Sequence, residues 1–201
     1  MLAKQLDAYR GKDVMVLAIP MGGVPVAYEV AKELKAPLDV IMAKKIGAPF
    51  NQELAIGAVT WNGAVLLDED MVQKWSISRD YVGDISRKLI KDMADKLNEL
   101  RAGQGSFPKL FDRIVIIIDD GIATGNTMIA AVEAVRDQGA REVVIATPVL
   151  PKELVETMEL VAPLAYIQAP DDFEAVGQYY HEFEPTSPDV VTDDLKKANP
   201  F

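Results

Sequence analysis

The chain has 201 residues, 49% of them hydrophobic and 26% charged, so it can bury a sizeable core and does not have the composition of a disordered protein. Its formal net charge of −10 argues against a nucleic-acid partner, because phosphates repel an acidic surface. The absence of cysteine and the single histidine exclude disulfides, thiolate metal sites and a histidine-based metal cluster. No apolar run approaches the roughly 20 residues that span a bilayer. The first residues carry no apolar stretch of the signal-peptide kind, so we expect a cytoplasmic protein without a membrane partner.

The first half of the chain predicts strands and helices in alternation. A buried strand over 14–19 leads through the turn Pro-Met-Gly-Gly into a helix over 24–35, in which apolar residues recur at helical spacing. The elements expected next are a strand at 38–46, a loop at 47–53, a hairpin that turns at Asn62-Gly63 and a long helix at 78–100.

The second half continues the alternation. The elements expected are a strand at 113–118, a helix at 126–140, a strand at 142–149, a helix at 151–160, a strand at 163–170 and an acidic, proline-containing tail. The nearly unbroken apolar runs of 113–118 and 142–149 indicate a parallel sheet covered on both faces. We therefore expect one α/β domain over 1–201, a doubly wound, mostly parallel sheet flanked by helices. Ligands of such sheets sit at the carboxyl ends of the strands.

Asp119 and Asp120 fall at such an end and are followed by a small-residue loop that opens a helix. A helix N-terminus offers unpaired N–H groups to an anion, Thr124 and Thr127 add hydroxyl donors, and Gly125 allows close approach. This loop is suited to a phosphate. The two carboxylates would repel a phosphate, so their task is to hold hydroxyls, a metal ion, or both. Paired aspartates at a strand end also occur as receiver phosphorylation sites, as Mg²⁺ ligands and as helix caps.

The stretch Ile116–Met128 resembles the thirteen-residue phosphoribosyl pyrophosphate (PRPP) signature of type I phosphoribosyltransferases. The resemblance implies that Asp119 and Asp120 hold the ribose hydroxyls and take part in catalysis. It also implies Mg²⁺ as cofactor, with these two aspartates as indirect or weak metal ligands. The residues expected at the 5′-phosphate are Gly121, Ala123, Thr124, Gly125, Asn126 and Thr127.

The resemblance extends from about Val16 to Phe183, to a predicted branch of this family. The matching blocks are Pro20–Val24, Lys45–Glu53, Ile116–Met128 and Asp172–Tyr180. The residues expected at the pyrophosphate are Met21, Gly22, Gly23, Lys44 and Lys45. Met21 stands where the family usually has a basic residue, which leaves the contact of this turn to the glycine backbone. Read alone, the turn is also compatible with an ordinary strand-to-helix connection, and the two lysines with a solvated surface.

Two further segments have expected roles. Glu53 lies in the region that closes over the substrate in this family, where it would accept a proton from the attacking nitrogen or stabilise positive charge at C1′. A solvent-facing loop glutamate is the alternative. The long helix lies within an inserted, mobile region over 78–103. Residues 170–183 would form a small C-terminal hood in which Phe173, Tyr179 and Tyr180 stack on the accepting base; packing or a dimer contact also explains the aromatic cluster.

The implied reaction is the Mg²⁺-dependent transfer of the 5-phosphoribosyl group from PRPP to a nitrogen nucleophile, a nucleobase by expectation, with release of pyrophosphate. Ala123 stands where enzymes for 6-oxopurines commonly carry an aspartate, which counts against hypoxanthine and guanine. The alternative is a non-catalytic regulatory protein that binds PRPP or a nucleotide, a hypothesis that Met21 supports. A receiver domain is disfavoured, because the first strand ends without an acid. The long helix and acidic surface are compatible with a homodimer.

Overall fold

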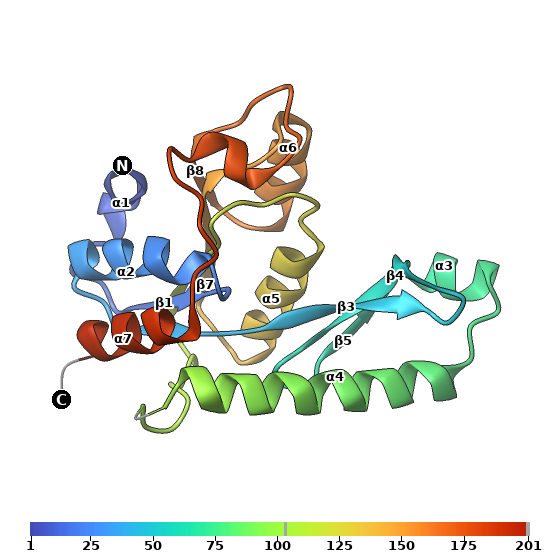
Figure 1. Ribbon diagram of the computed structural model, residues 1–201. Coiled ribbons are helices and arrows are strands. Elements are labelled where there is room, and N and C mark those ends of the chain that lie inside the picture. The colour runs from blue at the N-terminus through green and yellow to red at the C-terminus, as the bar shows by residue number, and fades with distance from the viewer. Residues whose placement is uncertain (103, 200–201) are drawn as a thin grey trace.

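A five-stranded parallel sheet forms the centre of the computed structural model, which describes residues 1–102 and 104–199 (Figure 1). Its strands lie in the order β2-β1-β6-β7-β8, and every neighbouring pair is parallel. Their bounds are β1 Val14–Ala18, β2 Leu38–Val40, β6 Ile114–Ile118, β7 Glu142–Val149 and β8 Leu164–Gln168. The α/β sheet expected from the sequence is confirmed.

Helices cover both faces of this sheet, and alternation along the strands decides which residues face which layer. Val14, Val16 and Ala18 of β1 belong to a core shared with α1 (Leu2–Gln5), α2 (Gly23–Leu34) and α7 (Pro188–Ala198). Met15 and Leu17 of the same strand belong to a second core with α5 (Asn126–Asp137) and α6 (Lys152–Val161). The expected doubly wound arrangement is therefore present.

A second, antiparallel sheet projects from the first as an arm (Figure 1). It contains β3 Ala43–Ala48, β4 Asn51–Thr60 and β5 Val65–Leu67, and α3 Glu69–Lys74 and α4 Arg79–Leu100 accompany it. Buried residues including Ile46, Ile56 and Met93 give the arm its own core. The hairpin at Asn62-Gly63 is confirmed between β4 and β5, with φ +89° at Gly63.

Two expectations about this region are wrong. The single strand at 38–46 is two strands in different sheets, β2 and β3, because the apolar sequence continues through the crossing at Ile41 and gives no local break. The loop at 47–53 is mostly strand. A register shift at Gly47, where a Cβ would lie 2.5 Å from the Gln52 carbonyl oxygen, lets β3 and β4 pair almost up to their turn.

The C-terminal tail is helical where no element was expected. Helix α7 begins after Ser187, whose hydroxyl accepts a hydrogen bond from the Val190 amide, and has Pro188 in its first turn. Val191 and Leu195 are fully buried against α2 and the sheet. The long helix α4 agrees with the expected 78–100; residue 103 of the wider 78–103 region lies outside the described residues. No helix in the described part of the chain is long and apolar enough to cross a membrane.

A buried ion pair fastens the arm to the parallel sheet. Arg101, at the end of α4, donates from Nε and Nη2 to the two carboxylate oxygens of Asp39 in β2, at 2.7 and 2.8 Å. The side chains of Asp39 and Arg101 are only 7% and 14% exposed. The pair therefore fixes the C-terminal end of α4 beside an edge strand of the parallel sheet.

Replacing this arginine tests the attachment. We expect Arg101→Ala to lower the free energy of unfolding by about 3–5 kcal/mol, because it leaves the Asp39 carboxylate buried without its partner. Urea denaturation measures the change. The matched control is Arg87→Ala on the same helix, which breaks an exposed pair with Asp84 and should cost less than about 1 kcal/mol. Equal losses for the two variants would contradict the structural role of the Asp39 pair.

Candidate functional site

The two turns singled out from the sequence meet at the carboxyl edge of the parallel sheet. Strands β1 and β6 are neighbours in a register that aligns Ala18 with Ile118, and the Ile19 amide donates to the Ile118 carbonyl at 2.9 Å. A Cβ on Gly22 would lie 1.9 Å from Oδ2 of Asp120. The Asp120 carboxylate therefore occupies the space that a side chain on Gly22 would fill. The peptide bond between Pro20 and Met21 is cis.

The acidic pair is partly buried, and its two members interact. The backbone N–H of Asp120 donates to Oδ1 of Asp119 at 2.9 Å. Burial, followed by the negative charge of Asp120, raises the pKa of the Asp119 carboxyl well above its usual value. Asp119 therefore holds its proton to a higher pH than an exposed aspartate, as is common for carboxyls in ligand sites.

The loop after the acidic pair encloses a small cavity of about 180 Å³. It ends at the N-terminus of α5, where Gly125 has φ +80° and a Cβ would lie 2.7 Å from Cε of Met158. Only glycine combines that backbone angle with that close approach. The predicted residues that line the cavity are Asp119, Gly121, Ala123, Thr124, Gly125 and Thr127. Asn126, the first residue of α5, is exposed and is not among them.

A larger cavity of about 490 Å³ lies on the other side of the acidic pair, between the Met21–Gly22 turn and the C-terminal segment. Asp120 lines this cavity, whereas Asp119 lines the smaller one. The other lining residues are Pro25, Val26, Tyr180, Glu182, Phe183, Glu184, Pro185 and Thr186. Residues 182–186 were missed as site residues. The only sequence signal for them is that they directly follow the aromatic cluster.

The hood segment contacts the acidic loop directly. Tyr180 donates its hydroxyl hydrogen to the backbone carbonyl of Asp120 at 2.6 Å. Burial, with the charges of Asp120 and Asp119, raises the pKa of the Tyr180 hydroxyl. Val176 of the short 3₁₀ helix η2 (Val176–Tyr179) takes the space beside Gly121, where a Cβ would lie 2.5 Å from its Cγ1. The hood thus holds the loop at two points.

The other two aromatic residues of the hood lie elsewhere. Phe173 and Tyr179 stack on each other, with centroids 5.6 Å apart and an interplanar angle of 9°. Tyr179 also donates to the Asp172 carbonyl at 3.2 Å. Neither lines the larger cavity, as far as the described residues define it. Of the three residues expected at the base, the structure brings only Tyr180 to the acidic pair, and the stacking roles stay predictions.

Lys44, Lys45 and Glu53 lie on the antiparallel arm. Lys45 Nζ is 2.7 Å from Oε2 of Glu53 on the neighbouring strand. Both side chains are exposed, and Lys45 lowers the pKa of Glu53. None of the three residues lines either cavity beside the acidic pair, within the described ranges. Their roles toward pyrophosphate and in proton transfer stay predictions.

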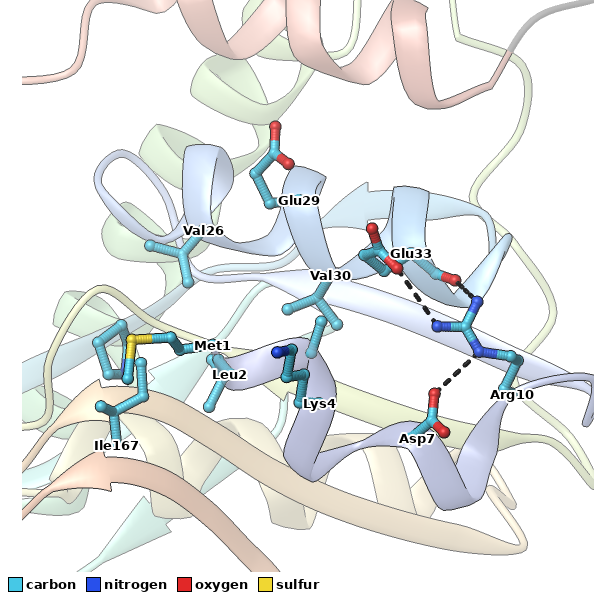
Figure 2. Close-up of a pocket in the computed structure, with 12 residues that line it drawn as sticks. Met1, Leu2, Lys4, Asp7, Arg10, Val26, Glu29, Val30, Glu33 and Ile167 are labelled. Carbon is cyan, nitrogen blue, oxygen red and sulfur yellow. Dashed lines mark hydrogen bonds and ion pairs between the residues drawn. The ribbon is translucent and has the colours of Figure 1, made fainter.

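A third cavity, of about 380 Å³, is built by different elements (Figure 2). It lies between α1, the 3₁₀ helix η1 (Asp7–Tyr9), α2 and the ends of β7 and β8. Its most prominent polar group, Arg10, is already bonded to Asp7 at 2.9 Å and to Glu33 at 3.3 Å (Figure 2). None of the site residues expected from the sequence lines it.

The comparisons with known proteins agree with this geometry. The family described as "Phosphoribosyl transferase domain" matches residues 1–184. This chain belongs to that family. The phosphoribosyltransferase resembles, with a TM-score of 0.85 and 34% identity, the crystal structure of TT1426 from Thermus thermophilus, over 98% of this chain and 93% of that one.

Curated relatives at 41% identity come from two strains of Mycobacterium tuberculosis and carry the names "Putative phosphoribosyl transferase Rv0571c" and "Putative phosphoribosyl transferase MT0597". The match covers 98% of this chain but only 45% of each relative, so the chain spans about half the length of these proteins. The type I phosphoribosyltransferase family indicated by the signature is confirmed.

The close approach of Gly22 to Asp120 gives a test of this phosphoribosyltransferase site. We expect Gly22→Ala to weaken PRPP binding at least about tenfold, because the new Cβ displaces the Asp120 carboxylate. Isothermal titration calorimetry measures the affinity, and circular dichroism checks the fold. The control is Gly105→Ala, where no atom lies within 4 Å of the added Cβ. Unchanged affinity in Gly22→Ala would show that the turn does not position the acidic pair.

The raised pKa of Asp119 predicts a pH-dependent stability. Because the folded-state pKa is above the unfolded one, ionising Asp119 opposes folding as the pH rises past the usual carboxyl range. We expect Asp119→Asn to raise Tm at pH 8 by about 2–4 °C, the shift that about 1 kcal/mol produces in a chain of this size. The gain should shrink toward pH 4, where the wild-type carboxyl is protonated.

Differential scanning calorimetry across this pH range checks the prediction. Asp92→Asn, on the exposed face of α4, is the matched control and should change Tm by less than about 1 °C. A loss of stability in Asp119→Asn at pH 8 would contradict the burial cost assigned to this carboxylate.

Proposed function

We propose that this protein transfers the 5-phosphoribosyl group of PRPP to a nitrogen nucleophile and releases pyrophosphate, with Mg²⁺ as cofactor. One observation carries the proposal: the acidic pair lies between two cavities at the carboxyl edge of the sheet, and one of them ends at the N-terminus of α5. A sugar phosphate has anionic and hydroxyl groups in the same order. Membership of the phosphoribosyl transferase family supports a PRPP-linked reaction in general.

Each part of PRPP has a matching environment. The small cavity offers the N–H groups at the start of α5 and the Thr124 and Thr127 hydroxyls to the 5′-phosphate. Asp119 and Asp120 accept hydrogen bonds from the ribose hydroxyls. The diphosphate then extends from C1′ toward the Gly22 turn, whose backbone approaches because neither Gly22 nor Gly23 has a side chain.

The carboxylate oxygens of this site suit a hard cation. Magnesium commonly keeps several waters and binds through one or two carboxylates together with substrate phosphates. Among the described residues, no three His, Cys, Asp or Glu side chains gather as a self-sufficient metal site. This donor set therefore fits an ion that arrives with the substrate, held by Asp119 or Asp120. When bound, Mg²⁺ would neutralise charge on the leaving diphosphate.

The reaction needs positioning more than a reactive side chain. The lone pair of the acceptor nitrogen forms a bond to C1′ while the C1′–O bond breaks, and pyrophosphate leaves with that electron pair. The nitrogen releases its proton to water or to a carboxylate. Positive charge develops at C1′, as in other glycosyl transfers. The acidic pair fixes the ribose during this displacement, and the hood bonded through Tyr180 limits access of water.

A second candidate function is a PRPP-binding regulator without turnover. Met21 favours it, because this residue lines the larger cavity where the family resemblance expects a basic side chain for pyrophosphate. Such a protein would bind PRPP without consuming it. Pyrophosphate release in the presence of nitrogen bases separates the two functions.

The first test is a calorimetric titration with PRPP, with and without Mg²⁺. We expect binding that depends on Mg²⁺ and that falls at least about 100-fold in an Asp119→Asn/Asp120→Asn double variant, which loses both acceptors for the ribose hydroxyls. The Asp92→Asn control should bind like the wild type. Because Asp119→Asn is expected to stabilise the fold, unfolding would not explain the loss. Full retention of PRPP binding by the double variant would overturn the proposal.

A further inference from the structure

The larger cavity beside Asp120 has a distinctive charge. Three carboxylates line it, those of Asp120, Glu182 and Glu184, and none of its described lining residues is a lysine, arginine or histidine. Neither Glu182 nor Glu184 forms an ion pair with any other residue in the described part of the chain. The carboxylates therefore remain available to a ligand.

The walls of the same cavity suit a flat ring. The side contributed by the Met21 turn and the start of α2 is apolar, with Pro25 and Val26. The opposite side carries the rings of Tyr180 and Phe183, whose centroids are 5.2 Å apart at an interplanar angle of 49°. Apolar and aromatic walls with a few polar groups are typical of sites for small heterocycles.

The Tyr180 contact places this cavity next to the reacting centre. The Tyr180 hydroxyl is bonded to the Asp120 carbonyl, so the acidic wall is anchored to the residue that would hold the ribose. An acceptor on the aromatic wall thus lies on the side of the acidic pair opposite the phosphate cavity. Its exocyclic groups then meet the carboxylates of residues 182 and 184.

We infer that the acceptor is a planar nitrogen heterocycle bearing amino groups, whose N–H donors pair with Glu182 and Glu184. An ionised carboxylate only accepts hydrogen bonds, so it favours an amino group and repels the oxygen of an oxo or carboxylate group. The inference rests on the proposed function, because it identifies the cavity as the acceptor side of that reaction. Glu182 and Glu184 are thereby assigned as specificity-determining residues.

Matched pairs of bases test the inference. Adenine and hypoxanthine differ in an amino against an oxo group, as do cytosine and uracil. With PRPP and Mg²⁺, we expect kcat/KM for pyrophosphate release to be at least about tenfold higher for the amino member of at least one pair. In Glu182→Gln/Glu184→Gln the ratio should approach one, mainly through a higher KM for the amino base, because a glutamine amide both donates and accepts.

Glu29→Gln is the charge-matched control. Glu29 lies on α2 but lines the cavity of Figure 2 instead, so this variant should keep the wild-type ratio. Melting temperatures of the two variants check that each is folded. Altered selectivity in Glu29→Gln as well would mean that overall charge, and not the two cavity carboxylates, sets the preference, and would overturn the inference.

Binding without turnover separates this inference from the proposed function. Saturation-transfer NMR with the four bases measures the amino preference even if no base is converted. A preference that disappears in Glu182→Gln/Glu184→Gln supports the inference whatever the PRPP titration gives. Equal binding within both pairs, including no binding by any base, overturns it. Failure of PRPP to bind in calorimetry overturns the proposed function instead.

Discussion

The parallel pairing of β1 with β6 is the constraint on which the site depends. These strands are far apart in the sequence, and their register places both carboxyl ends at one level of the sheet. The turn after β1 and the acidic pair after β6 must then share one small volume. They do so because Gly22 has no side chain and Asp120 takes its place. A site of this kind requires both a sheet contact and a glycine.

The buried core makes the local cost of the acidic pair tolerable. Ile116, Ile117 and Ile118 are fully buried in the centre of the sheet directly before the two aspartates. Their burial anchors a strand end at which two like charges lie side by side and the pKa of Asp119 is raised. Functional sites commonly hold such unfavourable groups, and the surrounding fold supplies the stability to keep them in place.

Two attachments decide what surrounds the acidic pair. The Asp39–Arg101 ion pair fastens the antiparallel arm to the edge strand β2. The bond from Tyr180 to the Asp120 carbonyl fastens the C-terminal segment to the loop. The second attachment brings an acidic, aromatic wall to the larger cavity. The chemistry of the acceptor side therefore comes from a segment outside the parallel sheet, while the phosphate side comes from the sheet itself.

The sequence by itself determined the alternating strands and helices, the PRPP signature and its place at a strand end. Apolar periodicity and loop composition are local properties, and they indicated these features correctly. Only the tertiary structure decided that 38–46 divides between two sheets, that α7 packs on α2, and that Lys45 pairs with Glu53. It also brought Glu182 and Glu184 to the site. These features depend on which distant segments pack together, and burial patterns along one segment do not specify the partner.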